Sequence, residues 1–295
     1  MTVVLGFIGL GVMGEPICRN LAQKSGATVR AFDIDSAPLE RLAPHGVQPA
    51  ASVADALAGA EVLFLSLPSG EVVRAICDGD AGLLAAVRPG QIVIDTSTSP
   101  VDTTRALAAE FAARGAVFVD APVARTRAAA EAGALSVMVG ASAELFERIR
   151  PLISTFATDI TLCGEVGCGQ VVKILNNMVL FETVVALSEA RHIGERAGVD
   201  PKLLFDTLSK GSADSFALRN HGLKAIVPDT FPDRAFSVRY AGKDLRYAMQ
   251  LAEQAGVDAR GTRTVRHWFD VAEAAGDGDY YFPVVSRSIG GRGNG

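Results

Sequence analysis

Residues 3–21 read VVLGFIGLGVMGEPICRNL, a short apolar run followed by three glycines and the start of a helical pattern. Gly9, Gly11 and Gly14 form G-x-G-x-x-G directly after a predicted strand at Val3–Ile8. Glycines so placed allow a tight turn and let the backbone approach a pyrophosphate, whose charge then lies at a helix N-terminus. The pattern predicts a dinucleotide site, and we assign cofactor contacts to the loop residues Gly9, Gly11, Val12, Met13 and Gly14.

An acidic residue follows at the distance that such a site requires. Asp33 closes the second predicted strand, Thr28–Phe32. A carboxylate there can accept both adenosine ribose hydroxyls and repels a 2′-phosphate. No arginine follows Asp33 to receive such a phosphate, so the sequence favours NAD over NADP; for the neighbouring Asp35 and Ser36 a turn or helix cap is the plainer interpretation.

The first half of the chain alternates short β-branched runs with alanine-rich helical stretches, which is typical of a parallel sheet wrapped by helices. The predicted strands are Val3–Ile8, Thr28–Phe32, Val62–Ser66, Ile92–Ile94, Val117–Val119, Ala134–Val139 and Asp159–Leu162. The predicted helices are Pro16–Lys24, Pro38–Leu42, Val53–Ala58, Glu71–Ile76, Asp102–Arg114 and Ala143–Thr155.

From Gln170 onward the strand signals vanish, and a helical pattern of close to thirty residues begins. Apolar residues surround this helix, so we expect it to be buried against the sheet domain or against a second subunit in a homodimer or homotetramer. Further helices are predicted at Lys202–Ser209, Lys243–Ala255 and Thr262–Ala275, and the tail 290–295 is expected to fray. The fold class is therefore α/β: an NAD-binding Rossmann domain at 1–163 and an all-helical substrate and oligomerisation domain at 164–295.

Composition narrows the class of protein. The 295 residues are 49% hydrophobic and carry a net charge of −5, which offers no basic surface for nucleic acid or an anionic membrane. No apolar run approaches the roughly 20 residues of a membrane span, and the first residues enter a strand directly, so we expect a soluble, cytoplasmic protein. The four cysteines lack the partners of a zinc site and are expected to be incidental thiols, with no metal.

Two turns leave neighbouring predicted strands where a nicotinamide would lie. Leu67 and Pro68 follow the third strand, and Thr98 follows the fourth. The carboxyl edge of a parallel sheet is where ligands bind in such folds. We therefore predict cofactor contacts for Leu67, Pro68 and Thr98, although Thr98 could also be only a turn residue.

Five stretches stand in order along the chain: FIGLGVMGEPICRNL, DTSTSPVDT, DAPVARTRAAAEAGALSVMVG, GCGQVVKILNNM and AGKDL. Together they resemble the β-hydroxyacid dehydrogenase family, which includes 3-hydroxyisobutyrate dehydrogenase, tartronate semialdehyde reductase and 6-phosphogluconate dehydrogenase. The resemblance extends over nearly the whole chain. It implies a Rossmann domain, an all-helical C-terminal domain and hydride transfer with a nicotinamide cofactor.

The resemblance places the family's catalytic lysine on Lys173 and its partner asparagine on Asn177, with Asn176 beside the substrate. Lys173 and Asn177 are four residues apart and so project from one helix face. Lys173 also lies near a helix N-terminus, which is expected to lower the pKa of its ammonium and suit it to general acid and base catalysis. A snorkelling surface lysine beside a helix-interior asparagine is the alternative.

The resemblance also matches the family's C-terminal lysine and aspartate to Lys243 and Asp244. Lys243 is expected to reach the cofactor or substrate, whereas Asp244 is expected to cap or pair. An ordinary exposed ion pair is the alternative.

The chain departs from the family after Pro122. Members usually have Ser-Gly-Gly here, whose small residues let backbone amides hold a substrate carboxylate, but this chain has Ala124, Arg125 and Thr126. Such a segment looks like the sulfolactaldehyde reductase branch, and Arg125 offers a planar set of donors for an oxyanion. We therefore expect Arg125 and Thr126 to contact substrate, with a surface arginine as the alternative.

The sequence thus predicts an NAD-dependent oxidoreductase that interconverts a small anionic aldehyde and its primary alcohol, with Lys173 as acid and base. The leading substrate pair is 3-sulfolactaldehyde and 2,3-dihydroxypropane-1-sulfonate. The alternatives are a 3-hydroxyisobutyrate dehydrogenase or a succinic or tartronate semialdehyde reductase. A non-catalytic nucleotide-binding interaction module is the alternative of another class.

Overall fold

The computed structural model describes residues 3–233 and 235–291. Two compact units are present, one ending at Lys173 and the other beginning at Ile174. The predicted boundary at 163/164 lies one residue before the end of the sheet at Gly164, and the ten residues between the two divisions include the first turn of a long helix, which belongs to the first unit. The predicted fraying of the tail falls largely on 292–295, which lie outside the described residues.

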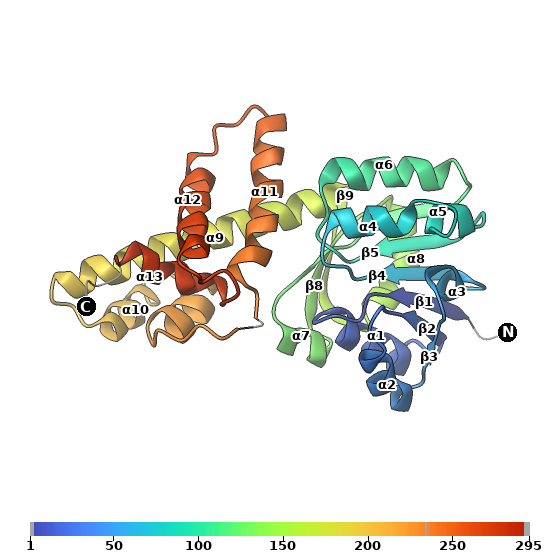
Figure 1. Ribbon diagram of the computed structural model, residues 1–295, viewed down its shortest axis with the longest axis horizontal. Coiled ribbons are helices and arrows are strands. Elements are labelled where there is room, and N and C mark those ends of the chain that lie inside the picture. The colour runs from blue at the N-terminus through green and yellow to red at the C-terminus, as the bar shows by residue number, and fades with distance from the viewer. Residues whose placement is uncertain (1–2, 234, 292–295) are drawn as a thin grey trace. The chain divides into compact units, whose positions relative to one another are not determined.

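Among the described residues of the first unit, nine strands form one sheet with the order β3-β2-β1-β4-β5-β6-β8-β7, and β9 pairs with β8 (Figure 1). The strands from β3 to β6 run parallel, whereas β8 is antiparallel to both β6 and β7. The strands are β1 (Val4–Ile8), β2 (Thr28–Phe32), β3 (Val47–Pro49), β4 (Val62–Leu65), β5 (Ile92–Asp95), β6 (Val117–Asp120), β7 (Val123–Ala124), β8 (Leu135–Gly140) and β9 (Ala157–Gly164).

The chain order reverses at β1, which lies between β2 and β4. Open parallel sheets bind ligands outside the carboxyl ends of the strands at such a reversal. The glycine loop leaves β1 at this edge. The topology therefore confirms the predicted doubly wound fold and brings the loop after β1 next to those after β2 and β4.

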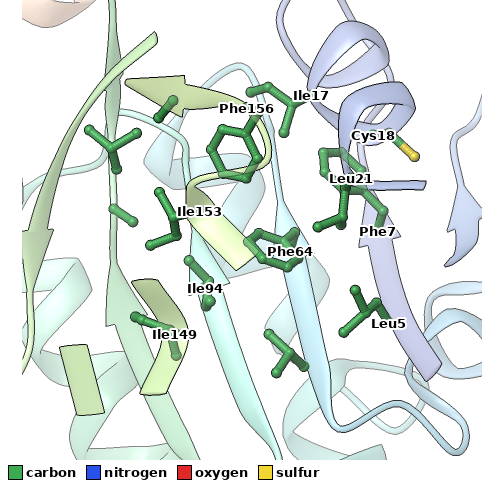
Figure 2. Packing of buried hydrophobic residues seen from close by; sticks show 14 of the residues in the cluster. Leu5, Phe7, Ile17, Cys18, Leu21, Phe64, Ile94, Ile149, Ile153 and Phe156 are labelled. Atoms are coloured by element: carbon green, nitrogen blue, oxygen red, sulfur yellow. The ribbon is translucent and has the colours of Figure 1, made fainter. Parts of the chain in front are cut away.

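Helices cover both faces of the sheet because its central strands are apolar on both sides; every residue of β4 is buried. Figure 2 shows one face, where Phe64 of β4 lies among Phe7, Phe156 and Ile153. The helices of this unit are α1 (Gly14–Lys24), α2 (Ala37–Leu42), the 3₁₀ turn η1 (Ala43–His45), α3 (Val53–Leu57), α4 (Gly70–Cys77), α5 (Leu83–Ala86), α6 (Val101–Ala112), α7 (Arg127–Ala132) and α8 (Ala143–Ile153).

The second unit is helical, and an aromatic cluster forms its core. Phe181 lies 5.1 Å from Phe282 and 5.5 Å from Phe269 between ring centroids. Such edge-on and tilted pairs add to the stability that burial of the rings provides. The elements are α9 (Cys168–Arg196, which begins in the first unit), α10 (Pro201–Leu208), the π-helical η2 (Leu218–Ile226), α11 (Val238–Gln254), α12 (Arg260–Ala274), the 3₁₀ turn η3 (Phe282–Val284) and α13 (Val285–Ile289).

Helix α9 has the predicted length, at 29 residues, but it is not buried on all sides. Val172, Leu175 and Val179 are exposed in the single chain, so burial of this face against a second subunit stays a prediction. Among the described residues, α9 is the one helix long and apolar enough to cross a membrane by length and composition. Phe181 and Val184 nevertheless lie in the helical core, as in a core helix of a globular domain.

The elements that the sequence interpretation missed are the short ones. They are β3, α5, β7, α7, η1, η2, η3 and α13, most of which have six residues or fewer. Short elements carry too few periods of the hydrophobic pattern to be recognised. Thr126, for instance, caps α7 by accepting a hydrogen bond from the Ala129 N–H. A capping residue alone does not predict a helix when only six helical residues follow it.

Candidate functional site

The glycine loop after β1 is shaped by two glycines and left open at the third. A Cβ on Gly9, whose φ is +94°, would lie 2.3 Å from the Ser66 carbonyl oxygen, and one on Gly14 would lie 2.0 Å from the Gly9 carbonyl oxygen. At Gly11 no described atom lies within 4 Å of the Cβ position. Close packing thus requires two of the glycines, while Gly11 leaves room at the N-terminus of α1 for a ligand phosphate.

The other residues assigned to this loop line its outer side. Val12 is 56% exposed and Met13 is half-buried, directly before α1. An apolar side chain this exposed at a ligand-binding edge offers a surface for a bound nucleotide. The loop fits the dinucleotide predicted from the sequence.

Asp33 ties the end of β2 to the glycine loop. Its Oδ2 accepts a 2.5 Å hydrogen bond from the Leu10 N–H, and its Oδ1 accepts one of 2.9 Å from the Asp35 N–H. A carboxylate has about four acceptor sites, so both oxygens can also accept ribose hydroxyls. Asp33 therefore has a structural role that the sequence interpretation missed, in addition to a position suited to the adenosine ribose.

Two further loops meet at the same edge. The Leu67 N–H donates a 2.9 Å hydrogen bond to Ser97 Oγ, which joins the loop after β4 to the loop after β5. Pro68 is exposed, and Thr98 is half-buried between Ser97 and Ser99. The structure thus brings Leu67 and the Thr98 loop together, as predicted from their positions at strand ends.

The carboxylate of Asp120, at the end of β6, occupies the N-terminus of α9. Its Oδ1 accepts from the Gly167 N–H at 2.7 Å and its Oδ2 accepts from the Gln170 N–H at 2.8 Å. Burial raises the pKa of Asp120, and these hydrogen bonds oppose that rise. The Asp120 carboxylate thus lies at the positive end of the helix that carries Lys173, a charge that the sequence alone did not place there.

Asp95 is a second buried carboxylate, paired with Asp120 in the register of β5 and β6. Its oxygens accept from the Ser97 N–H at 2.9 Å and from Ser99 Oγ at 3.0 Å. Burial raises the pKa of Asp95 to about 6. The sequence interpretation gave neither aspartate a role, although an aspartate ending each of two adjacent buried strands was a signal.

Lys173 and Asn177 lie on α9, one turn apart, and both are buried, with 9% and 1% of their surface exposed. The alternative of a snorkelling surface lysine is therefore wrong. Asn177 Nδ2 donates a 2.6 Å hydrogen bond to Asp244 Oδ2, while Asn177 Oδ1 accepts from Asn176 Nδ2 at 3.1 Å. Asn176 is itself largely exposed.

Lys243 and Asp244 form a buried ion pair on α11, with Nζ 3.1 Å from Oδ1. The Lys243 ammonium also lies 4.7 Å from the ring centroid of Tyr240 and 5.4 Å from that of Tyr247. An exposed ion pair, the alternative considered for these residues, is excluded. These contacts with one aspartate and two aromatic rings restrict the conformations of the Lys243 side chain, and a restricted side chain loses less entropy when it binds a ligand.

Arg125 is engaged with protein groups. Its Nη1 donates to the Ala134 carbonyl oxygen at 2.8 Å and to Thr158 Oγ1 at 3.1 Å, and its Nη2 lies 2.7 Å from Asp159 Oδ2. The Thr158 hydroxyl and the Arg125 guanidinium lower the pKa of Asp159. The backbone of Arg125 has a φ of +89°, the left-handed region that favours glycine.

The four cysteines differ in burial: Cys163 and Cys168 are partly exposed. Cys18 and Cys77 are buried, and burial raises the pKa of Cys77 to about 12. Within residues 3–233 and 235–291, no group of three or more histidine, cysteine or acidic side chains is arranged to hold a metal ion.

Two family models match the chain. Residues 4–164 match the NAD binding domain of 6-phosphogluconate dehydrogenase, and residues 167–283 match the NAD-binding region of NADP-dependent 3-hydroxyisobutyrate dehydrogenase. The two matches together cover nearly the whole chain and meet between β9 and α9.

Known proteins resemble the chain over most of its length. It is 34% identical over 277 residues to 2-(hydroxymethyl)glutarate dehydrogenase of Eubacterium barkeri, covering 94% of this chain and 91% of that one. It is 36% identical over 254 residues to 3-hydroxyisobutyrate dehydrogenase of Pseudomonas aeruginosa, covering 84% and 85%. The structure of Mycobacterium tuberculosis 3-hydroxyisobutyrate dehydrogenase with L-serine matches with a TM-score of 0.88 at 33% identity, covering 98% and 99% of the two chains.

Proposed function

Because the chain belongs to the β-hydroxyacid dehydrogenase family and is an NAD-dependent oxidoreductase acting on CH–OH groups, we propose that its substrate is a small 3-hydroxy carboxylic acid. The names of its relatives support this class: 3-hydroxyisobutyrate, L-serine and 2-(hydroxymethyl)glutarate each carry a primary alcohol on the carbon β to a carboxylate. Oxidation converts that alcohol to an aldehyde and transfers a hydride to NAD⁺, with release of one proton.

The observation that carries the carboxylate assignment is the conformation of Arg125. Its φ of +89° lies in the left-handed region that favours glycine, the residue type that the family resemblance leads us to expect at this position. The Arg125 guanidinium donates hydrogen bonds to Thr158 and Asp159, so protein groups already bind the side chain that glycine lacks. A non-glycine residue at such a φ costs about 1–3 kcal/mol of stability. Backbone strain of this kind occurs at binding sites, and we take it to indicate that the backbone conformation at Arg125 serves substrate binding. We therefore place carboxylates ahead of sulfonates.

Lys173 is the general base in alcohol oxidation and the general acid in aldehyde reduction. It takes the hydroxyl proton as the carbonyl forms and returns it in reverse, so protons balance across the step. Its burial, at 9% exposed, limits the water that could compete for that proton. Asn177, whose amide is held by Asp244, orients the reacting oxygen.

Leu67, Pro68, Thr98 and Lys243 complete the cofactor site in this proposal. The first three lie at the carboxyl edge of the sheet beside the glycine loop. Lys243 supplies a cation for the cofactor. We further propose that the protein works as a cytoplasmic homodimer or homotetramer, in which the exposed apolar residues Val172, Leu175 and Val179 of α9 are covered by a second copy.

The narrower candidate, sulfolactaldehyde reduction, depends on Arg125. The Arg125–Asp159 pair is solvent-exposed, with 39% and 58% of the two side chains accessible, and exposed pairs contribute only about 0–1 kcal/mol. A substrate sulfonate could therefore take the place of Asp159 at little cost, which keeps this candidate as the second one.

Variants of Arg125 separate the two candidates. For a carboxylate substrate, Arg125→Gly removes the backbone strain and should leave kcat/KM within about threefold of wild type or raise it. Arg125→Ala should behave similarly, with some loss from the positive φ. A fall of kcat/KM by about a hundredfold for sulfolactaldehyde in both variants, with efficient turnover of that substrate by wild type, would instead assign Arg125 to the sulfonate.

A further inference from the structure

Gln170, in the first turn of α9, is completely buried, and both ends of its amide are used. Its Oε1 accepts a 3.1 Å hydrogen bond from the Ser99 N–H, and its Nε2 donates one of 2.9 Å to the Ser97 carbonyl oxygen. These two backbone groups flank Thr98. One side chain of α9 is therefore hydrogen-bonded to the loop after β5 on both sides of Thr98, which is proposed to contact the cofactor.

The backbone of Gln170 is also hydrogen-bonded to a buried group. Its N–H donates to Asp120 Oδ2, and the adjacent Gly169 leaves space for that carboxylate, since a Cβ there would lie 2.8 Å from Oδ2. The Ser97 and Ser99 that Gln170 contacts are bound in turn to Asp95. The start of α9, the end of β6 and the loop after β5 are thus joined by one buried network through Gln170.

Lys173 follows Gln170 by three residues, less than one helical turn. Any tilt or shift of the first turn of α9 relative to the loop after β5 moves the Lys173 ammonium relative to Thr98. The Gln170 amide opposes such a shift because each of its hydrogen bonds is directional and buried.

We propose that Gln170 is a positioning residue, which sets the distance between the proton-transfer group Lys173 and the Thr98 loop of the cofactor site. The inference rests on the proposed function, since it assigns Gln170 an effect on Lys173 chemistry. It assigns Gln170 no contact with substrate or cofactor.

The chain contains a matched control for a merely structural glutamine. Gln91 is also buried, directly before β5, at the opposite end of the same strand. Its Oε1 accepts from the Arg88 N–H at 2.7 Å, and its Nε2 donates to the Ala60 and Leu57 carbonyl oxygens at 2.7 and 3.1 Å. Gln91 therefore makes the same kinds of bond far from the carboxyl edge.

The experiment compares Gln170→Met with Gln91→Met. Both substitutions keep the side-chain length and remove the hydrogen bonds, so both should lower the melting temperature. We expect Gln170→Met alone to lower kcat, by about ten- to a hundredfold, because small displacements of catalytic groups have effects of that size. The Kd of NADH, measured by calorimetry, should change by a smaller factor than kcat, since the glycine loop and Asp33 are untouched and only the Thr98 contact is disturbed.

Hydrogen exchange of the protein without cofactor or substrate provides a readout independent of activity. Peptides covering residues 96–100 should exchange faster in Gln170→Met than in wild type or Gln91→Met, because the Ser99 N–H loses its acceptor. A kcat for Gln170→Met within twofold of wild type, or an equal loss of kcat in Gln91→Met, overturns the proposal.

Gln170→Glu is the second variant, should the methionine variant fail to fold. A protonated carboxyl can reproduce both hydrogen bonds, whereas an ionised one places a negative oxygen against the Ser97 carbonyl. The carboxylates of Asp95 and Asp120 share hydrogen-bonded partners with this position, and the Lys173 ammonium follows on the same helix. We expect kcat relative to wild type to recover as pH falls, and a ratio that stays at or near 1 at every pH overturns the proposal.

The failure of the inference is distinguishable from the failure of the proposed function. If wild type oxidises no 3-hydroxy carboxylic acid, the proposed function fails, while the exchange comparison still reports whether Gln170 holds the loop. If wild type is active and Gln170→Met matches Gln91→Met, the inference alone fails.

Discussion

Asn177 and Asp244 are joined by a 2.6 Å hydrogen bond between two side chains that are almost completely buried. Asp244 also pairs with Lys243, so one carboxylate holds both an amide and an ammonium that the proposed function uses. Since Asp244 accepts from Asn177 Nδ2, the amide cannot rotate freely. Asn177 is thereby suited to orienting a substrate oxygen rather than to exchanging a proton.

Loss of Asp244 should therefore cost more stability than loss of an ordinary surface aspartate. Asp244→Ala leaves the Lys243 ammonium buried without its carboxylate, and breaking a buried pair in this way costs about 3–5 kcal/mol. Denaturant unfolding of Asp244→Ala, with Asp159→Ala as the exposed control, measures the difference. Equally small losses of unfolding free energy in both variants would show that the buried pair contributes no more to stability than the exposed one.

Lys173→Ala should lower kcat by about a hundredfold or more while NADH still binds, because proton transfer is removed and the nucleotide loop is intact. Asn177→Ala should act in the same direction with a smaller effect. Steady-state kinetics together with NADH titration separate kcat from binding. Unchanged turnover in Lys173→Ala excludes Lys173 as the acid and base.

Cofactor preference should follow Asp33. We expect NADH to be preferred to NADPH by at least about tenfold in kcat/KM, equivalent to roughly 1.4 kcal/mol, because the carboxylate repels the extra phosphate. Asp33→Ser should narrow this ratio. It should also weaken the binding of both cofactors, since the Leu10 N–H loses its acceptor, so the ratio is the informative quantity. Equal kcat/KM values for the two cofactors in wild type contradict the assignment.

The pH dependence of stability tests the buried Asp95. Its pKa of about 6 in the folded protein exceeds the unfolded value of about 3.9, so the folded state binds the proton more tightly. This carboxyl therefore favours folding below pH 4 and loses that contribution as pH rises through 6. Asp95→Asn keeps one acceptor and cannot ionise. The difference in unfolding free energy between this variant and wild type should therefore shift in favour of the variant from pH 4 to pH 7.5, by on the order of 2 kcal/mol. Denaturant unfolding at both pH values measures this, and a difference independent of pH contradicts it.

The sequence alone was sufficient for the fold and for the loops of the site because those signals are local. G-x-G-x-x-G, Asp33 and the order of strands and helices lie within short windows, and Lys173 and Asn177 belong to one helix. The contacts that define what these residues do span longer separations: 50 residues between Asp120 and Gln170, and 67 between Asn177 and Asp244. Such pairs follow from tertiary packing, which no local pattern reports.

Arg125 illustrates the same limit. Its residue type indicated an oxyanion site, but the direction of its guanidinium depends on Asp159, 34 residues further along the chain. Its positive φ was equally invisible in the residue type, since arginine seldom adopts that conformation. The conformation of Arg125 is the reason why we propose carboxylates ahead of sulfonates, while the class of reaction is as predicted.

The central claim, oxidation of a 3-hydroxy carboxylic acid, is tested most directly by the wild-type enzyme with NAD⁺ and two matched alcohols. The pair is 3-hydroxyisobutyrate and 2,3-dihydroxypropane-1-sulfonate, each followed by NADH formation at equal concentrations. We predict that kcat/KM for the carboxylate exceeds that for the sulfonate by at least about tenfold, or 1.4 kcal/mol. Efficient turnover of the sulfonate with little or no turnover of the carboxylate would contradict the account.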